Sequence, residues 1–164
     1  MSVGESSDGY SMTAPEPDGK GAEMAMKNAL DNADLKAEQI AYVNLHGTST
    51  PHNDSMESKA VSRIFGDDIA CSSSKSIIGH TLGAAGATET ALCWLMLSST
   101  YNPDRKILPH LWDGEVGEDI SLNNFASVGD TISTDVKSLY VISNFCAFGG
   151  SNASIILKQD SADD

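Results

Sequence analysis

Segments with the apolar period of a helix alternate along this chain with short segments typical of strands. Apolar residues recur at helical spacing over 21–33, again over 54–65 and again over 80–98. Strand-like runs lie between and after them, over 39–45, 69–73, 139–144 and 153–158. The order helix, strand, helix, strand, helix, strand, strand predicts an α/β domain with a layered, mixed β-sheet and packed helices.

The two ends of the chain differ from this periodic body. Residues 1–19 are polar and rich in turn-forming residues, which predicts a linker or loop. The domain itself is expected over 20–158, and the charged tail 159–164 is expected to fray. Asp54 and Glu57 have the spacing of a capping box, so we expect the second helix to begin near Asp54.

The charge balance excludes two classes of partner. The 164 residues carry a formal net charge of −13, with only 10 Lys and Arg residues, which are scattered along the chain. Nucleic acids and anionic membranes would be repelled by such a chain. No apolar run is long enough for a membrane-spanning helix, so neither nucleic acid nor a membrane is an expected partner.

Cysteine number and the N-terminal residues point to the cytoplasm. The 3 cysteines are an odd number without metal-binding spacing, and this favours a reducing compartment. The segment Met1-Ser2-Val3-Gly4-Glu5 has neither the basic nor the apolar region of a secretory signal. We therefore expect a cytoplasmic protein without a metal site.

Two histidines stand at the ends of structured segments. His46 directly follows the strand-like run 40–45 and is followed in turn by Thr48 and Thr50, whose hydroxyls could bind an elongated substrate. His80 precedes the small-residue run 82–87, so we expect it at a helix start, where free N–H groups would keep its ring neutral. The two imidazoles could converge on one substrate carbonyl. The alternative for residues 46–50 is a turn that only supports the loop.

An ionisable pair is predicted beside the histidines. Glu89 lies among Ala, Leu and Trp residues, and a buried carboxylate there would need a partner. Lys75 is the candidate partner. The alternative is that Glu89 faces solvent.

Phe148 is followed by Gly149 and Gly150 between the last two strands. Glycines at this position permit positive φ angles, so the phenyl ring could swing as a hinged side chain. The alternative is a tight strand connection with a core Phe.

The cysteines are the obvious candidates for a nucleophile. Cys71 and Cys93 fall in a predicted strand and an apolar helix, which indicates core positions. Cys146 lies near the glycines of the last strand connection, but a nucleophilic role is the less favoured interpretation for it too.

Four motifs in this order resemble the C-terminal half of a β-ketoacyl-acyl-carrier-protein synthase, of the elongating, His–His class in the thiolase-like superfamily. The matching residues are His46-Gly47-Thr48-Ser49-Thr50-Pro51 with Asp54 and Glu57, Ser74-Lys75 with Gly79-His80, Leu82-Gly83-Ala84-Ala85-Gly86 with Glu89, and Asn144 with Phe148-Gly149-Gly150-Ser151-Asn152-Ala153. The resemblance extends from about Ser6 to Lys158. It implies a thiolase-like half-fold.

The resemblance also implies a reaction and roles for residues. Such enzymes join an acyl chain held on a cysteine to malonyl-acyl-carrier protein by decarboxylative Claisen condensation. His46 and His80 would bind the malonyl thioester carbonyl, with Lys75 and Glu89 as their polar support. Substrate-binding residues would be Thr48 and Thr50 for the phosphopantetheine arm and Phe148 with Gly149 for the acyl gate.

The same resemblance implies partners. The phosphopantetheine is carried by the acyl carrier protein, so no resident cofactor is expected. The nucleophilic cysteine belongs to the N-terminal half of the family, from which residues 1–19 would enter this domain. A homodimer is expected for the full-length enzyme, whereas this chain alone is expected to be inactive.

Two departures from the family pattern concern the loop and the gate. Asn53 replaces the usual Gly before Asp54, and Phe145-Cys146-Ala147 replaces the usual Ser-Phe-Gly before Phe148. The second change predicts a bulkier, less mobile gate. Two other functions stay open, a non-condensing accessory subunit similar to a chain-length factor, and a lone decarboxylase or carrier-binding module.

Overall fold

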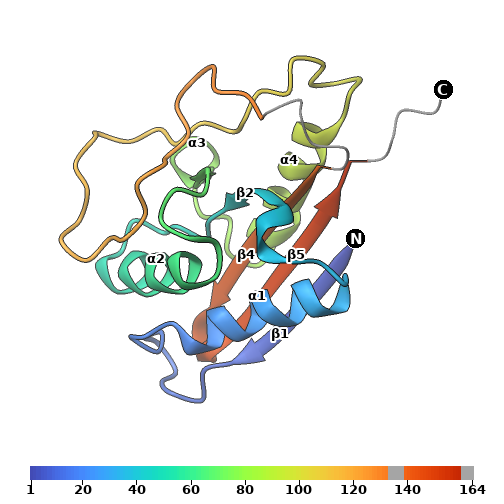
Figure 1. The fold of residues 1–164 in the computed structure, drawn as a ribbon. Coiled ribbons are helices and arrows are strands. Elements are labelled where there is room, and N and C mark those ends of the chain that lie inside the picture. The colour runs from blue at the N-terminus through green and yellow to red at the C-terminus, as the bar shows by residue number, and fades with distance from the viewer. Residues whose placement is uncertain (133–138, 160–164) are drawn as a thin grey trace.

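A five-stranded mixed sheet forms the centre of the molecule (Figure 1). The computed structural model describes residues 1–132 and 139–159. The spatial order of the strands is β1-β5-β4-β2-β3. Their bounds are Ser2–Ser7, Ser151–Lys158, Tyr140–Ala147, Ile40–Asn44 and Cys71–Ser72. Strand β2 is parallel to β3 and β4, whereas β5 is antiparallel to β4 and β1. The predicted mixed sheet with packed helices is confirmed.

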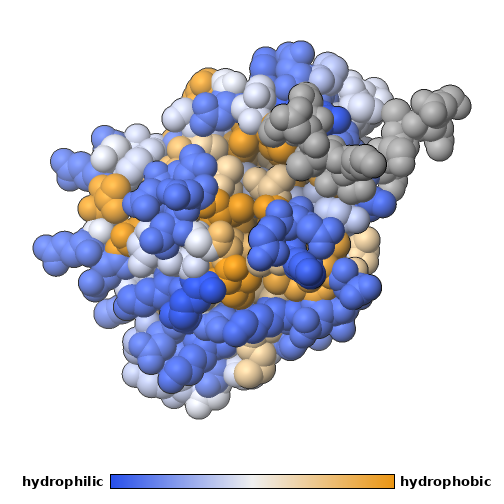
Figure 2. Space-filling view, viewed as in Figure 1, coloured by the Kyte–Doolittle hydropathy of each residue, from blue (hydrophilic) through white to orange (hydrophobic). Residues whose placement is uncertain are grey.

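Helices cover both faces of this sheet. Helices α1 (Lys20–Asn32) and α2 (Pro51–Phe65) bury Met26 and Val61 against one face, together with Ile142 of β4. Helix α4 (Ala85–Leu97) buries Cys93 on the other face, beside Val141. Neighbouring residues of one strand point to opposite faces, so β4 contributes to both cores. In Figure 2 the surface along α1 is polar, and apolar side chains show in the depression beside it.

Residues 2–7 correct the predicted linker over 1–19. They form strand β1, which pairs with β5 from Ser2 opposite Ile156 to Ser7 opposite Ser151. Within the predicted linker, the loop comprises residues 8–19. Of the predicted tail 159–164, only Gln159 lies within the described ranges.

The helix boundaries also differ from those predicted. Helix α2 begins at Pro51 rather than near Asp54, and Glu57 accepts hydrogen bonds from other backbone groups, described below. The helix predicted over 80–98 is shorter and interrupted. A short helix α3 (Lys75–Ile78) and a 3-10 turn η2 (Leu82–Ala84) precede α4, because Gly79 and Leu82 have positive φ angles of 74° and 50°. A further 3-10 turn, η1 (Ala37–Gln39), leads into β2.

Residues 98–132 run without long helices or strands along one end of the sheet (Figure 1). An isolated bridge pairs Phe125 with Cys71 of β3, and another pairs Lys106 with Thr131. Among the described residues, no helix combines the length and apolar character needed to span a membrane.

Candidate active site

Strand β2 and the loop before α4 bring His46 and His80 together. Their ring centroids are 5.5 Å apart, and the rings meet edge to face at 86°. His46 is buried at the end of β2, whereas His80 is exposed. His80 lies on the loop between α3 and η2, five residues before α4, so its predicted position at the start of a long helix is wrong. The predicted convergence of the two imidazoles is nevertheless present.

Hydrogen bonds select the same tautomer for both imidazoles. Nδ1 of His80 accepts from the backbone N–H of Leu82 at 3.2 Å. Nδ1 of His46 lies 3.4 Å from Nζ of Lys75, and an ammonium group can only donate. In its neutral form, each imidazole therefore carries its proton on Nε2.

Lys75 connects the His46 backbone to Glu89. Its ammonium group donates to the carbonyl oxygen of His46 and, at 2.6 Å, to Oε1 of Glu89. The Glu89 side chain has 0% exposure and that of Lys75 has 7%, so the alternative of a solvent-facing Glu89 is excluded. Burial raises the pKa of Glu89, and the Lys75 ammonium opposes this rise. The predicted ion pair is present.

His46 is neutral over the physiological range. Burial, followed by the charges of Lys75 and His80, lowers its pKa from 6.5 to about 3. A neutral imidazole can donate its Nε2–H to an oxyanion that develops on the substrate.

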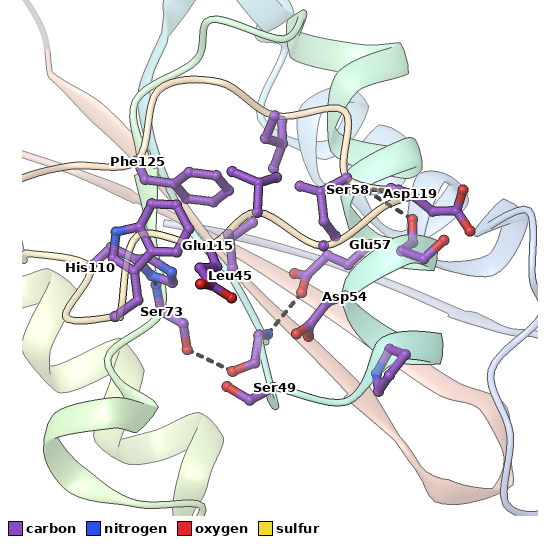
Figure 3. A pocket seen from close by; sticks show the side chains of 18 of the residues that line it. Leu45, Ser49, Asp54, Glu57, Ser58, Ser73, His110, Glu115, Asp119 and Phe125 are labelled. Carbon is purple, nitrogen blue, oxygen red and sulfur yellow. Dashed lines mark hydrogen bonds between the residues drawn. The ribbon is translucent and has the colours of Figure 1, made fainter.

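Glu57 holds the turn that carries His46. Its two carboxylate oxygens accept from the backbone N–H groups of His46 at 2.8 Å and Gly47 at 2.9 Å. Figure 3 shows this side chain reaching from α2 toward the turn. Burial raises the pKa of Glu57 to about 7 although both N–H groups stabilise the charged form. The sequence suggested Glu57 as part of a helix cap, and its actual partners lie ten and eleven residues earlier.

A cavity of about 650 Å³, here called the histidine cavity, contains both imidazoles. The other predicted residues that line it are Thr48, Thr50, Phe148 and Gly149. The hydroxyls of Thr48 and Thr50 are 2.9 Å apart. The sequence therefore identified six of its lining residues, and Lys75 and Glu89 lie behind His46.

Phe148 and Gly149 of the strand connection 148–150 are exposed, whereas Gly150 is buried. Phe148 has 80% exposure, and Gly149 has a φ angle of +82°, which favours glycine. The N–H of Gly149 donates to the carbonyl of Met12 at 2.8 Å. The alternative of a buried, core Phe148 is excluded.

Residues 8–15 form a wall of the histidine cavity that sequence reasoning missed. Asp8, Thr13, Ala14 and Pro15 all line it. Asp8 accepts from the side-chain amide of Asn152 at 2.7 Å, and this contact joins the wall to β5. The only sequence signal for this wall is the cluster of turn residues over 8–19, a pattern that also predicts a linker.

The three thiols are poor nucleophiles in this structure. Burial raises the pKa of Cys71 and of Cys93 to about 12. Cys146 lines the histidine cavity, but burial also raises its pKa well above its usual value. A thiolate is the reactive form of cysteine, so all three are unsuited to nucleophilic attack.

Comparison with known sequences decides the family. The family model described as "Beta-ketoacyl synthase, C-terminal domain" matches residues 1–106. This chain belongs to that family.

Relatives of this β-ketoacyl synthase domain extend the match over almost all of the chain. It is 40% identical to 3-oxoacyl-[acyl-carrier-protein] synthase 2 of Vibrio harveyi over 97% of its length, and 42% identical to synthase 1 of Haemophilus influenzae over 97%. The chain spans only 37% and 36% of these two relatives.

Solved structures show that the β-ketoacyl synthase domain has the predicted thiolase-like half-fold. A ketosynthase in complex with its chain length factor, from Xenorhabdus doucetiae, matches with a TM-score of 0.81 and 42% identity. The match covers 97% of this chain and 38% of that one. A β-ketoacyl synthase from Burkholderia phymatum matches with a TM-score of 0.80 and 38% identity, over 98% and 37% of the two chains.

Proposed function

We propose that this chain is the decarboxylating half of a 3-oxoacyl-acyl-carrier-protein synthase. The observation that carries the proposal is the pair His46 and His80, whose rings lie 5.5 Å apart and line one cavity. Two imidazole N–H donors on one cavity suit a thioester carbonyl that becomes an enolate oxyanion.

The proposed reaction begins with a malonyl thioester on its carrier. The thioester oxygen accepts hydrogen bonds from Nε2–H of both histidines, the bond to the terminal carboxylate breaks, and carbon dioxide leaves. The electron pair of that bond forms the enolate. The enolate carbon then attacks the carbonyl carbon of an acyl thioester on a cysteine and forms a carbon–carbon bond. The carbon–sulfur bond to the cysteine breaks, the cysteine leaves as a thiolate, and the β-ketoacyl product remains on the carrier.

Other parts of this chain support the two steps. Lys75 and Glu89 hold His46 in place, and Thr48 and Thr50 contact the phosphopantetheine arm of the carrier. Phe148 and Gly149 form the acyl gate.

The acyl-accepting cysteine is proposed to lie in an N-terminal half of the same protein. The three thiols described here have raised pKa values, and the relatives are more than twice as long as this chain. Helix α4 supports this proposal because all its residues except Thr88, Glu89 and Thr90 are apolar or Gly, yet Trp94 and Leu95 are 55% and 39% exposed. A helix of that kind is normally covered on every side.

Assembly and location follow from the same proposal. Acyl carrier protein delivers both thioesters, and the full-length enzyme is a homodimer in the cytoplasm. The three free cysteines are compatible with a reducing compartment. An accessory subunit that only shapes a partner's pocket would not need the contacts that orient His46 and His80.

The test uses the full-length protein with His80→Ala. Decarboxylation of malonyl-carrier should fall by about 10²–10³-fold, the usual effect of losing one oxyanion donor. Acylation of the cysteine, followed by mass spectrometry, should change little. The control is Lys36→Ala, which removes an exposed side chain that lies outside the histidine cavity. An equal loss of acylation and decarboxylation in His80→Ala would contradict the proposed role.

A further inference from the structure

A second cavity, of about 590 Å³, lies between α2 and the irregular segment 108–125 (Figure 3). We call it the aromatic cavity, because His110, Trp112 and Phe125 form one wall of it. Its volume is in the range of small-molecule sites. Along residues 45–51 the odd-numbered residues line this cavity and the even-numbered ones line the histidine cavity.

The aromatic wall is held in place before any ligand binds. His110 stacks on Phe125 with centroids 4.9 Å apart, and Trp112 packs 5.4 Å and 5.2 Å from those two rings. Nδ1 of His110 accepts from the backbone N–H of Ser73 at 3.1 Å, and Phe125 is bridged to Cys71 of β3. A wall fixed by backbone contacts costs little conformational entropy when a ligand binds.

The charge around this wall is negative, and no basic side chain of the described residues that line the cavity neutralises it. Besides Glu57, the acidic residues that line the cavity are Asp54, Asp113, Glu115, Glu118 and Asp119. No Lys or Arg of the ranges 1–132 and 139–159 lines it. Burial lowers the pKa of His110, so this imidazole adds no positive charge at neutral pH. Figure 3 shows Glu115 and Asp54 near the space in front of the rings.

The arrangement distinguishes between two kinds of cation. A metal ion needs several ligands at one point, and no three His, Cys, Asp or Glu side chains in the described part of the chain are grouped to hold one. An organic cation instead interacts through its charge with dispersed carboxylates and with aromatic ring faces, which also pack against its body. We propose that the aromatic cavity binds a small organic ammonium ion with an apolar or aromatic body.

The test compares two probes of nearly equal shape on the full-length protein, 2-phenylethylammonium and uncharged 2-phenylethanol. Fluorine NMR of fluorotryptophan-labelled protein reports binding through the Trp112 signal, which the variant Trp112→Leu assigns. We expect the ammonium ion to bind at least about five-fold more tightly than the alcohol, which corresponds to the usual strength of a cation–π contact.

Two substitutions test the two parts of the site. Glu115→Gln should weaken binding of the ammonium ion about three-fold or more and leave the alcohol unaffected, because it removes one exposed charge. The matched control Glu38→Gln, an exposed acid outside the cavity, should change neither affinity. Trp112→Leu keeps apolar bulk, so calorimetry should show a greater loss for the ammonium ion than for the alcohol.

Three results would overturn the proposal. One is equal affinity of the two probes. Another is an equal effect of Glu115→Gln and Glu38→Gln. The third is failure of both probes to bind, which would mean that another segment of the full-length protein fills the cavity.

Discussion

Lys75 uses all three hydrogens of its ammonium group within the protein. One reaches Glu89, one the carbonyl oxygen of His46, and one Nδ1 of the His46 ring. Because no hydrogen is left for a substrate, we interpret Lys75 as a positioning residue. It sets the tautomer of His46 and lowers the pKa of that ring.

Replacement of Lys75 by Met should raise the pKa of His46 from about 3 toward its ordinary value of 6.5, because the neighbouring charge is lost while most of the burial remains. The measurement is an NMR titration of the His46 ring, with His46→Asn to assign the signal. An unchanged titration would show that burial alone determines the pKa of His46. Arg at position 75 keeps the charge and should restore part of the shift.

This depressed pKa also has a consequence for stability. Below pH 6.5 the unfolded chain binds a proton on His46, whereas the folded chain does so only near pH 3. The stabilising contribution of the neutral ring is therefore present above pH 6.5 and is lost as the pH falls toward 3, by up to about 1.4 kcal/mol per pH unit. Lys75→Met should reduce the part of the acid sensitivity of unfolding that arises from His46.

At the scale of elements, the strands that form the site could be predicted and the elements around them could not. The segment 40–44 and the two last strands contain Val, Ile and Tyr in short runs, which is a strong strand signal. Strand β1 has the sequence SVGESS and forms through its pairing with β5, a contact between residues about 150 positions apart. Propensity alone carries no information on such a partner.

The start of α2 differs from the predicted one for another reason. Pro51 directly after Thr50 is a common first residue of a helix, and this signal was present in the sequence. The spacing of Asp54 and Glu57, in contrast, predicts a start near Asp54. Glu57 was unavailable for capping because the turn at His46 requires its carboxylate, a demand that only the tertiary structure reveals.

Close packing of β1 on α1 gives a prediction for Gly4. A Cβ atom there would lie 2.1 Å from the carbonyl oxygen of Ala25 and 2.2 Å from the backbone nitrogen of Ala29. Gly4→Ala should therefore lower the free energy of unfolding by roughly 1–3 kcal/mol, the usual cost of overpacking. Gly83→Ala is the control, since a Cβ at Gly83 would meet no atom within 4 Å in the described structure. Equal urea midpoints for both variants would contradict this account.

For the whole molecule, the site was predictable only in part because its residues come from distant segments. The motifs around His46, His80 and Phe148 were visible in the sequence, and so was the pairing of Lys75 with Glu89. The contribution of Asp8 to the cavity wall was not visible, because it depends on β1 lying beside β5.

We predict that the purified 164-residue chain does not catalyse condensation. Its three thiols have raised pKa values, so no acyl-accepting thiolate stands opposite the two histidines. The assay mixes acyl and malonyl thioesters with the chain and detects β-ketoacyl product by mass spectrometry. The full-length protein is the positive control, and turnover by the chain alone would disprove the prediction.

The alternation along residues 45–51 makes this short segment a partition between two chambers. Its even positions present His46, Thr48 and Thr50 to one chamber, and its odd positions present Gly47 and Ser49 to the other. Neighbouring residues therefore belong to different compartments. Protein engineers could reshape either compartment with substitutions one residue apart and leave the lining of the other in place.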